Sequence, residues 1–367
     1  MTTKVLSIGL GGVGAIVAYT LCRNNPTDLE LTAVIRSDYD VVTSKGYTIS
    51  SVDYGGRREN GDPKESENAI KGFKPHNVVK SLEQVESGPF DYIVVSTKVI
   101  PSTAGNNVWD QVEANKAKLL KPNSATSIVL IQNGIDIEQY WKNLQKEAFL
   151  ISGVSYISST NSKGTITQYS HDSLLLGLFD ITMVHDQLAI AALEKFNILY
   201  SNDINSTKLD HNSRFTRWKK LLYNATYNTV CALTDLDVGQ LYELKDSVHV
   251  IDEVIFPMMK EVQKIANIDL HKYDYGSYEQ YIDDEHVTKM IKLTELYDAP
   301  QNYQPSMLVD ARSGRLIELD IILGNIIKSY KKNSEDGGKK IVQEIPYLNL
   351  LFYLLSMVQH RLKSTTK

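Results

Sequence analysis

A glycine-rich segment near the start of the chain is the feature that most restricts its fold. It reads Gly9-Leu10-Gly11-Gly12-Val13-Gly14, follows a short apolar run at residues 5–8 and precedes a helical pattern at residues 13–23. In such a strand–turn–helix unit the first glycine permits a tight turn, and the second lets the backbone come close to a bound pyrophosphate. The third lets the helix pack on the strand. The segment therefore predicts a turn that holds the pyrophosphate of a dinucleotide at a helix N-terminus.

Further strand and helix patterns alternate through the first half of the chain. Short apolar runs at residues 29–35, 91–96 and 127–131 continue the series and predict a parallel, doubly wound sheet of the Rossmann type. Residues 149–157 and 164–178 read as antiparallel strands added at the sheet edge, joined by a polar loop at 158–163. The charged, glycine-containing residues 50–74 read as a surface excursion.

Helical patterns dominate beyond a polar connector at residues 201–206. They cover residues 214–234, 248–266, 287–296, 306–330 and 346–362. The prediction is an α/β chain with a dinucleotide-binding Rossmann domain at 1–200 and an all-helical domain at 208–367. The tyrosine-rich residues 273–303 read as a cover over a cleft, and the apolar side chains of 346–362 suit either the core or a contact in a homodimer.

The end of the second strand predicts the cofactor. An NAD site would carry an acid there to accept from the ribose hydroxyl, whereas this chain has Arg36 followed by Ser37. A guanidinium beside a hydroxyl suits a 2′-phosphate, which favours NADPH. Asp38 leaves the opposite preference open, because it is an acid only two residues further on.

Polar residues follow the third and fourth core strands. Lys98 comes after residues 91–96, and Asn133 comes after residues 127–131. Because ligands of such sheets bind outside the carboxyl ends of the strands, both side chains are expected at the cofactor crevice.

A polar row is the most informative pattern of the second half. Lys220, Asn224 and Asn228 recur every four residues, so a continuous helix would place them on one face. Asparagine is unfavourable inside helices, and such departures from local propensity concentrate at functional sites. A solvent-facing polar stripe is the alternative. Further along, Ser306 reads as a functional residue or only as a helix N-cap, and Glu318, within a helical run, reads by itself as a surface carboxylate more readily than as a ligand contact.

Together these segments resemble the ketopantoate reductases (2-dehydropantoate 2-reductases). The matching pieces are Gly9 to Gly14, Arg36-Ser37, Thr97-Lys98, Gln132-Asn133-Gly134, Trp218 to Lys220 with Asn224 and Asn228, Ser306 to Asp310, and Glu318 to Asp320. They occur in family order from residue 4 to about residue 330.

The resemblance implies that NADPH reduces 2-dehydropantoate to pantoate, in pantothenate synthesis, in a cleft between a Rossmann and a helical domain. Lys220 matches the family's catalytic general acid, and Asn133, Asn224, Asn228 and Ser306 match substrate-binding positions. The implied cofactor contacts are Gly9, Leu10, Gly11, Gly12, Val13, Gly14, Arg36, Lys98, Asn133, Ser159 and Glu318.

Several residues depart from the family pattern on the substrate side. Thr229, Val238 and Pro305 stand where the family more commonly has proline, asparagine and serine. Two alternatives therefore remain: a reductase of a different branched 2-oxo acid, and an NADP-binding protein without catalysis.

The composition limits the partners and the cellular compartment that we expect for this protein. The net charge of −5 gives no reason to expect nucleic acid or an anionic membrane as a partner, and the distant Cys22 and Cys231 predict neither a disulfide framework nor a metal site. The N-terminal residues do not resemble a signal peptide, so we expect a cytoplasmic enzyme that acts on a small molecule.

Overall fold

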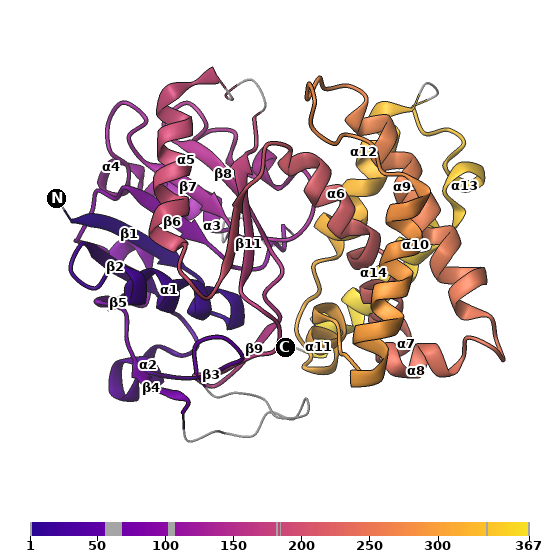
Figure 1. Cartoon of the computed structure of the whole chain (residues 1–367), viewed down its shortest axis with the longest axis horizontal. Coiled ribbons are helices and arrows are strands. Elements are labelled where there is room, and N and C mark those ends of the chain that lie inside the picture. The colour runs from indigo at the N-terminus through magenta and orange to yellow at the C-terminus, as the bar shows by residue number, and fades with distance from the viewer. Residues whose placement is uncertain are drawn as a thin grey trace. The chain divides into compact units, whose positions relative to one another are not determined.

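The computed structural model describes residues 2–55, 68–101, 107–180, 183, 185–334 and 337–365. The chain forms two compact units (Figure 1). One unit comprises Met1–Lys98, Thr103–Gln132 and Glu138–Ser213, and the other comprises Val99–Ser102, Asn133–Ile137 and Arg214–Lys367. The second unit therefore includes short segments that begin a few residues after two strands of the first.

The first unit is built on an eight-stranded sheet with the order β12-β11-β8-β7-β6-β1-β2-β5. All of its neighbouring strands run parallel except the antiparallel pair β8 and β11. This confirms the predicted doubly wound sheet. The bounds are β1 (Thr3–Ile8), β2 (Leu29–Val34), β5 (Asn77–Val79), β6 (Tyr92–Val95), β7 (Ser127–Leu130), β8 (Phe149–Ser155), β11 (Ser173–Leu178) and β12 (Ser206–Leu209).

Burial explains why the central strands are apolar runs. Every residue of β6 and β7 is buried, as expected for strands of a parallel sheet that is covered on both faces. Helices α1 (Gly12–Asn24) and α5 (Gln187–Tyr200) pack against each other. Other short helices of this unit are α2 (Tyr39–Lys45), α3 (Val108–Ala114) and α4 (Lys116–Leu119).

A second, four-stranded sheet corrects part of the sequence prediction. Its order is β4-β3-β10-β9, with β3 (Tyr47–Ser51), β4 (Ile70–Phe73), β9 (Ser159–Ser162) and β10 (Thr165–Gln168). The ends of the predicted excursion at 50–74 are thus strands, and so is most of the predicted loop at 158–163. Residues 56–67 of that excursion lie outside the described residues. The sequence did not predict these strands because they are only half-buried. Burial alternates along β3 and β10, and such strands carry as many polar as apolar residues.

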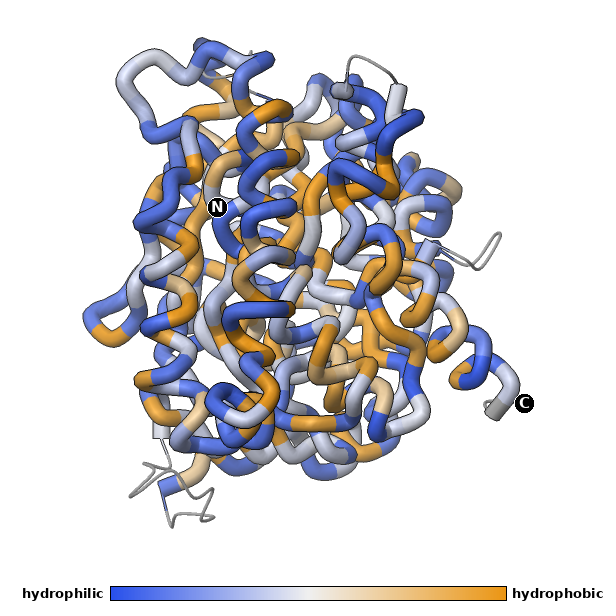
Figure 2. Tube along the Cα trace, turned by 90° about the vertical axis from the view of Figure 1, so that its right-hand side faces the viewer, coloured by the Kyte–Doolittle hydropathy of each residue, from blue (hydrophilic) through white to orange (hydrophobic). Residues whose placement is uncertain are grey.

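The second unit is helical, as predicted. Its α-helices are α6 (Ser213–Asn224), α7 (Tyr227–Thr234), α8 (Val238–Glu243), α9 (Phe256–Leu270), α10 (Asp284–Leu293), α11 (Ser306–Arg312), α12 (Asn325–Asn333), α13 (Ile341–Glu344) and α14 (Pro346–Thr365). In Figure 2 the colour changes between hydrophobic and hydrophilic along individual helices, which is the pattern of amphipathic helices around a core.

Two predicted helices are each interrupted. The helix expected at 214–234 ends at Asn224 and resumes at Tyr227, where the Thr226 hydroxyl donates to the Leu222 carbonyl at 2.5 Å. The helix expected at 306–330 ends at Arg312, because Gly314 adopts a φ of +67° that terminates it. Glu318 consequently precedes a new helical segment instead of lying inside one.

Two further expectations concern the last part of the chain. Residues 273–303, expected as a cover, contain α10 and bury Tyr275 and Ile282. Helix α14 buries Leu348, Leu351 and Leu355, so these three leucines belong to the core, and a homodimer stays a prediction. Within the described ranges, no helix combines the length and apolar character needed to cross a bilayer.

Candidate functional site

The glycine-rich turn joins β1 to α1, and Gly9 and Gly14 are among its glycines that cannot be replaced without strain. Gly9 has a φ of +92°, and a Cβ on it would lie 2.9 Å from the Thr97 backbone nitrogen. A Cβ on Gly14 would collide with the Gly9 carbonyl oxygen and the Ser96 Oγ. These contacts are the tight turn and the close helix–strand packing that the spacing predicts.

The N-terminus of α1 has the features of an anion site. Gly11 is its N-cap, and a Cβ there would meet nothing within 4 Å, so the backbone is open to an incoming group. Gly12 instead packs on the Ser159 carbonyl oxygen, 2.6 Å from the position its Cβ would take. Among the described residues, the buried Ser159 Oγ has no hydrogen-bond partner. The open backbone, the helix N-terminus and this hydroxyl fit a dinucleotide pyrophosphate.

Several residues predicted to contact the cofactor follow β2 and β6. Arg36 and Ser37 are both exposed directly after β2, and Lys98 is exposed after β6. Asp38 accepts a hydrogen bond of 2.7 Å from the Asn161 side chain. The Asp38 carboxylate is therefore already engaged within the first unit.

A short hydrogen-bond chain surrounds Lys220 in the helical unit. The Lys220 ammonium donates to Asn133 Oδ1 at 3.1 Å. Burial, followed by the Arg217 guanidinium, lowers the pKa of Lys220 to about 8, while the Glu318 carboxylate acts in the opposite direction. A lysine with this pKa exchanges its proton close to neutral pH, which is the property of a general acid or base.

Glu318 holds the other end of the Asn133 amide. Its carboxylate accepts from Asn133 Nδ2 at 3.3 Å and from the Val99 backbone nitrogen at 3.0 Å. Because the amide nitrogen must face the acid, the amide oxygen faces Lys220. Glu318 is buried, unlike an ordinary surface carboxylate.

The helical unit also binds the backbone that follows Asn133, through residues that the sequence reasoning missed. Arg217 donates to the Gly134 carbonyl at 2.9 Å, and Asn325 donates to the Ile135 carbonyl at 2.7 Å. Arg214 forms an ion pair of 2.9 Å with Asp136. The available signal was the cluster of basic residues at 214–220, since the helical spacing puts Arg217 beside Lys220.

The predicted row of Lys220, Asn224 and Asn228 lies in two helices. Asn224 is the last residue of α6, is buried and makes no side-chain hydrogen bond among the described residues. Asn228, in α7, accepts from the Met307 backbone nitrogen at 2.8 Å and donates to Ser306 Oγ at 3.5 Å. Ser306 is exposed and begins α11, and Pro305 is the N-cap, so Ser306 is not a capping residue.

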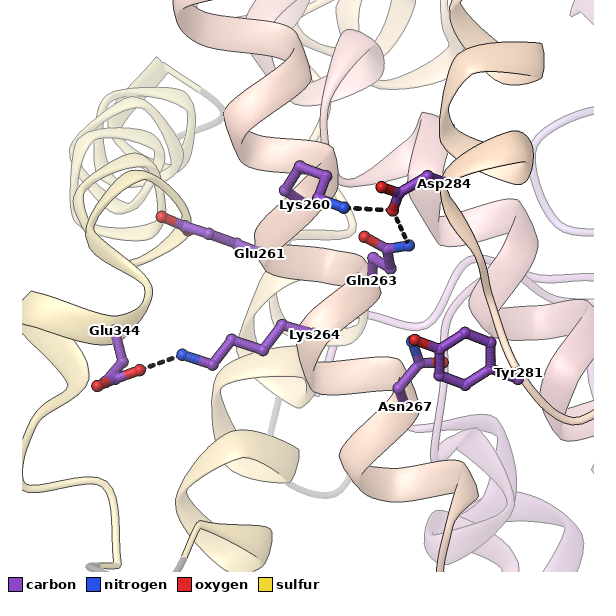
Figure 3. Close-up of a pocket in the computed structure, with 8 residues that line it drawn as sticks. All are labelled: Lys260, Glu261, Gln263, Lys264, Asn267, Tyr281, Asp284 and Glu344. Atoms are coloured by element: carbon purple, nitrogen blue, oxygen red, sulfur yellow. Dashed lines mark hydrogen bonds and ion pairs between the residues drawn. The ribbon is translucent and has the colours of Figure 1, made fainter.

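A separate groove on the helical unit contains none of the predicted residues (Figure 3). Its charged side chains satisfy each other or the backbone: Lys260 pairs with Asp284, Lys264 pairs with Glu344, and Glu261 accepts from the first backbone N–H groups of α14. The groove is therefore a structural junction. It is lined by Lys260, Glu261, Gln263, Lys264, Asn267, Tyr281, Asp284 and Glu344.

The parallel sheet and its glycine-rich turn define a protein of the Rossmann class with a helical C-terminal unit. Comparison with known families is more specific. Residues 5–180 match the family described as "Ketopantoate reductase PanE/ApbA", and residues 212–359 match "Ketopantoate reductase PanE/ApbA C terminal". The chain belongs to the ketopantoate reductase family, whose members are oxidoreductases that act on 2-oxo acids.

Individual relatives cover nearly the whole chain. An uncharacterised protein of Saccharomyces cerevisiae is 37% identical over 98% of this chain and 95% of its own length. The crystal structure of 2-dehydropantoate 2-reductase from Methylococcus capsulatus aligns with a TM-score of 0.67 and 24% identity, over 98% of this chain and 97% of that one. A ternary structure of D-mandelate dehydrogenase with NADH and anilino(oxo)acetate aligns with a TM-score of 0.73 and 18% identity, over 98% and 100%. The structural neighbours share the fold.

Proposed function

We propose that this protein is an NADPH-dependent reductase of a 2-oxo acid, and that 2-dehydropantoate is the substrate to test first. The observation that carries the proposal is the partly buried Lys220, which donates to Asn133 and has a pKa lowered to about 8. Residues 1–200 would bind the cofactor, and residues 208–367 would bind the substrate.

The reaction needs one proton donor from this chain. A bound reduced nicotinamide would supply a hydride to the ketone carbon, which moves the carbonyl electron pair onto oxygen. The Lys220 ammonium stabilises that developing negative charge and donates its proton to the oxygen, which leaves a 2-hydroxy acid and a neutral amine. Solvent then returns the proton to Lys220, so the lysine ends each cycle unchanged.

Neutral amides suit the remaining contacts with the substrate. Asn224 has unsatisfied hydrogen-bonding capacity, and Asn228 and Ser306 form a polar pair. With Asn133, these residues can hold the carboxylate and hydroxyl groups of a hydroxy acid without competing with Lys220 for its proton.

Most of the proposed cofactor contacts lie in the first unit, whereas Glu318 belongs to the helical unit. The turn from Gly9 to Gly14, including Leu10 and Val13, and the Ser159 hydroxyl would hold the pyrophosphate. Arg36 would bind the 2′-phosphate, and Lys98 and Glu318 would contact other parts of NADPH. Arg36→Ala should therefore weaken the binding of NADPH, measured as its dissociation constant, and leave that of NADH nearly unchanged. Equal weakening of both would contradict this role for Arg36.

The test of the proposed function is NADPH oxidation with a panel of 2-oxo acids that includes 2-dehydropantoate. Lys220→Met should reduce kcat by about a hundredfold or more, the usual contribution of a positioned general acid. Lys219→Met is the matched control, because Lys219 is the neighbouring lysine of the same helix and contacts the Phe215 ring. Equal activity of the two variants would reject Lys220 as the acid.

A different branched 2-oxo acid is the second candidate substrate. The departures Val238 and Pro305 are both buried, and Pro305 directly precedes the proposed contact Ser306. Turnover of another panel member, with 2-dehydropantoate at background, would select this candidate. Binding of NADPH without turnover of any 2-oxo acid would instead favour a non-catalytic NADP-binding protein.

A further inference from the structure

The Asn161 side chain, in β9, connects the glycine-rich turn to the end of β2. Its amide nitrogen donates to Asp38 Oδ2 at 2.7 Å and to the Leu10 carbonyl at 3.3 Å. Its amide oxygen accepts from the Gly164 backbone nitrogen at 3.1 Å. These three contacts use both ends of the amide, so its orientation is determined.

The Asp38 side chain bonds to Asn161 and does not cap the helix that it precedes. It occupies the N-cap position of α2, where an aspartate ordinarily accepts from the backbone of the first helical turn. No such capping bond forms here, and the carboxylate points to Asn161 instead. The tertiary contact with β9 therefore decides the direction of the Asp38 charge.

That direction matters because Asp38 is two residues beyond Arg36. A carboxylate after the second strand of this fold can accept from the 2′-hydroxyl of NAD, but it repels the 2′-phosphate of NADP. We propose that Asn161 is a specificity-determining residue, which favours NADPH by holding the Asp38 carboxylate at the glycine-rich turn. The inference rests on the proposed use of a nicotinamide dinucleotide and names a residue that sets the choice between the two forms.

Tyr47 offers a matched control for the contact with the turn. Its hydroxyl donates to the same Leu10 carbonyl at 3.0 Å, from strand β3 of the same small sheet. Tyr47→Phe removes a bond to Leu10 and does not remove the bond between Asn161 and Asp38. This variant therefore tests the effect of losing a bond to the turn while the bond between Asn161 and Asp38 is kept.

The experiment measures dissociation constants of NADPH and NADH from nicotinamide fluorescence, without substrate and without turnover. Asn161→Ala should weaken NADPH binding about tenfold relative to NADH, because the freed carboxylate can approach the phosphate. Adding Asp38→Asn to Asn161→Ala should restore the ratio of the two constants. Tyr47→Phe should change both constants by the same factor.

Two results would overturn the inference. One is an equal loss of NADPH and NADH binding in Asn161→Ala, which would mean that Asn161 only supports the turn. The other is an altered ratio that Asp38→Asn does not restore. Failure of the proposed function is distinguishable, because the 2-oxo acid panel reports turnover, whereas this cycle of variants reports binding alone. A natural chain that binds neither dinucleotide would overturn both.

Discussion

Two charged side chains act on the pKa of the Lys220 ammonium in opposite directions. Burial has the largest effect and lowers the pKa, the Arg217 guanidinium lowers it further, and the Glu318 carboxylate raises it. The pKa of Lys220 is therefore about 8. An amine with this pKa is mostly charged at neutral pH and still gives up its proton readily.

The pH dependence of reduction follows from this value. Lys220 must be protonated to donate, so kcat/KM should be constant below about pH 8 and should fall about tenfold per pH unit above it. The profile is measured as NADPH oxidation at subsaturating 2-oxo acid. An absence of any falling limb between about one pH unit below the pKa of Lys220 and about two units above it would argue against Lys220 as the donor.

Two charge variants should move that limb in opposite directions. Arg217→Gln removes the cation that lowers the pKa of Lys220, so the limb should move to higher pH. Glu318→Gln removes the carboxylate that raises this pKa, so the limb should move to lower pH. Lys219→Gln serves as the control and should leave the limb in place. Movement in the same direction for both variants would contradict this assignment of the charges.

At the scale of elements, two glycines with a positive φ occupy turns of the helical unit. Gly134 has a φ of +93°, and a Cβ on it would lie 2.8 Å from the Ile321 carbonyl oxygen. Gly314 also has a positive φ, +67°, but its Cβ would meet nothing within 4 Å. The two glycines thus share a backbone requirement and differ in the space around them.

The comparison of these glycines gives a stability prediction. Gly314→Ala should lower the free energy of unfolding by about 1–2 kcal/mol, the cost of a left-handed conformation for a residue with a Cβ. Gly134→Ala should lower it by more, because the clash with Ile321 adds to the same backbone cost. Urea denaturation of each variant measures the difference. A smaller loss for Gly134→Ala than for Gly314→Ala would be inconsistent with this packing.

Across the whole molecule, ionic contacts attach the segment that follows β7 to the helical unit. Arg214 bonds to Asp136 of that segment and, through two nitrogens, to the buried Asp269 of α9. Trp218 Nε1 also donates to Asp269, at 2.8 Å. One arginine therefore links the loop that carries Asn133 to the core of the helices.

Removing this arginine should destabilise the protein strongly. Arg214→Met leaves Asp269 buried without its cation, and the loss of one partner of a buried ion pair typically costs about 3–5 kcal/mol. The double variant Arg214→Met with Asp269→Asn should recover part of that free energy, because no uncompensated charge stays buried. Thermal and urea unfolding measure both. A loss below about 1 kcal/mol for Arg214→Met would place the pair among weak surface contacts.

The sequence by itself determined the parallel sheet, the glycine-rich turn and the helical character of the second half. These features depend on local spacing: apolar runs for strands that are buried on both faces, and glycine where no side chain fits, as at Gly9 and Gly14. The residues of the candidate site came from the same reading, with the family resemblance assigning their roles.

Only the tertiary structure decided how those residues are arranged. The orientation of the Asn133 amide by Glu318 and the small sheet that brings Asn161 to Asp38 both involve partners remote in the chain. Local propensity carries no record of such partners, since a polar residue in an isolated segment reads as solvent-exposed whatever it later contacts. The glycine-rich turn was therefore predictable from its own residues, whereas the contacts that orient its neighbours were not.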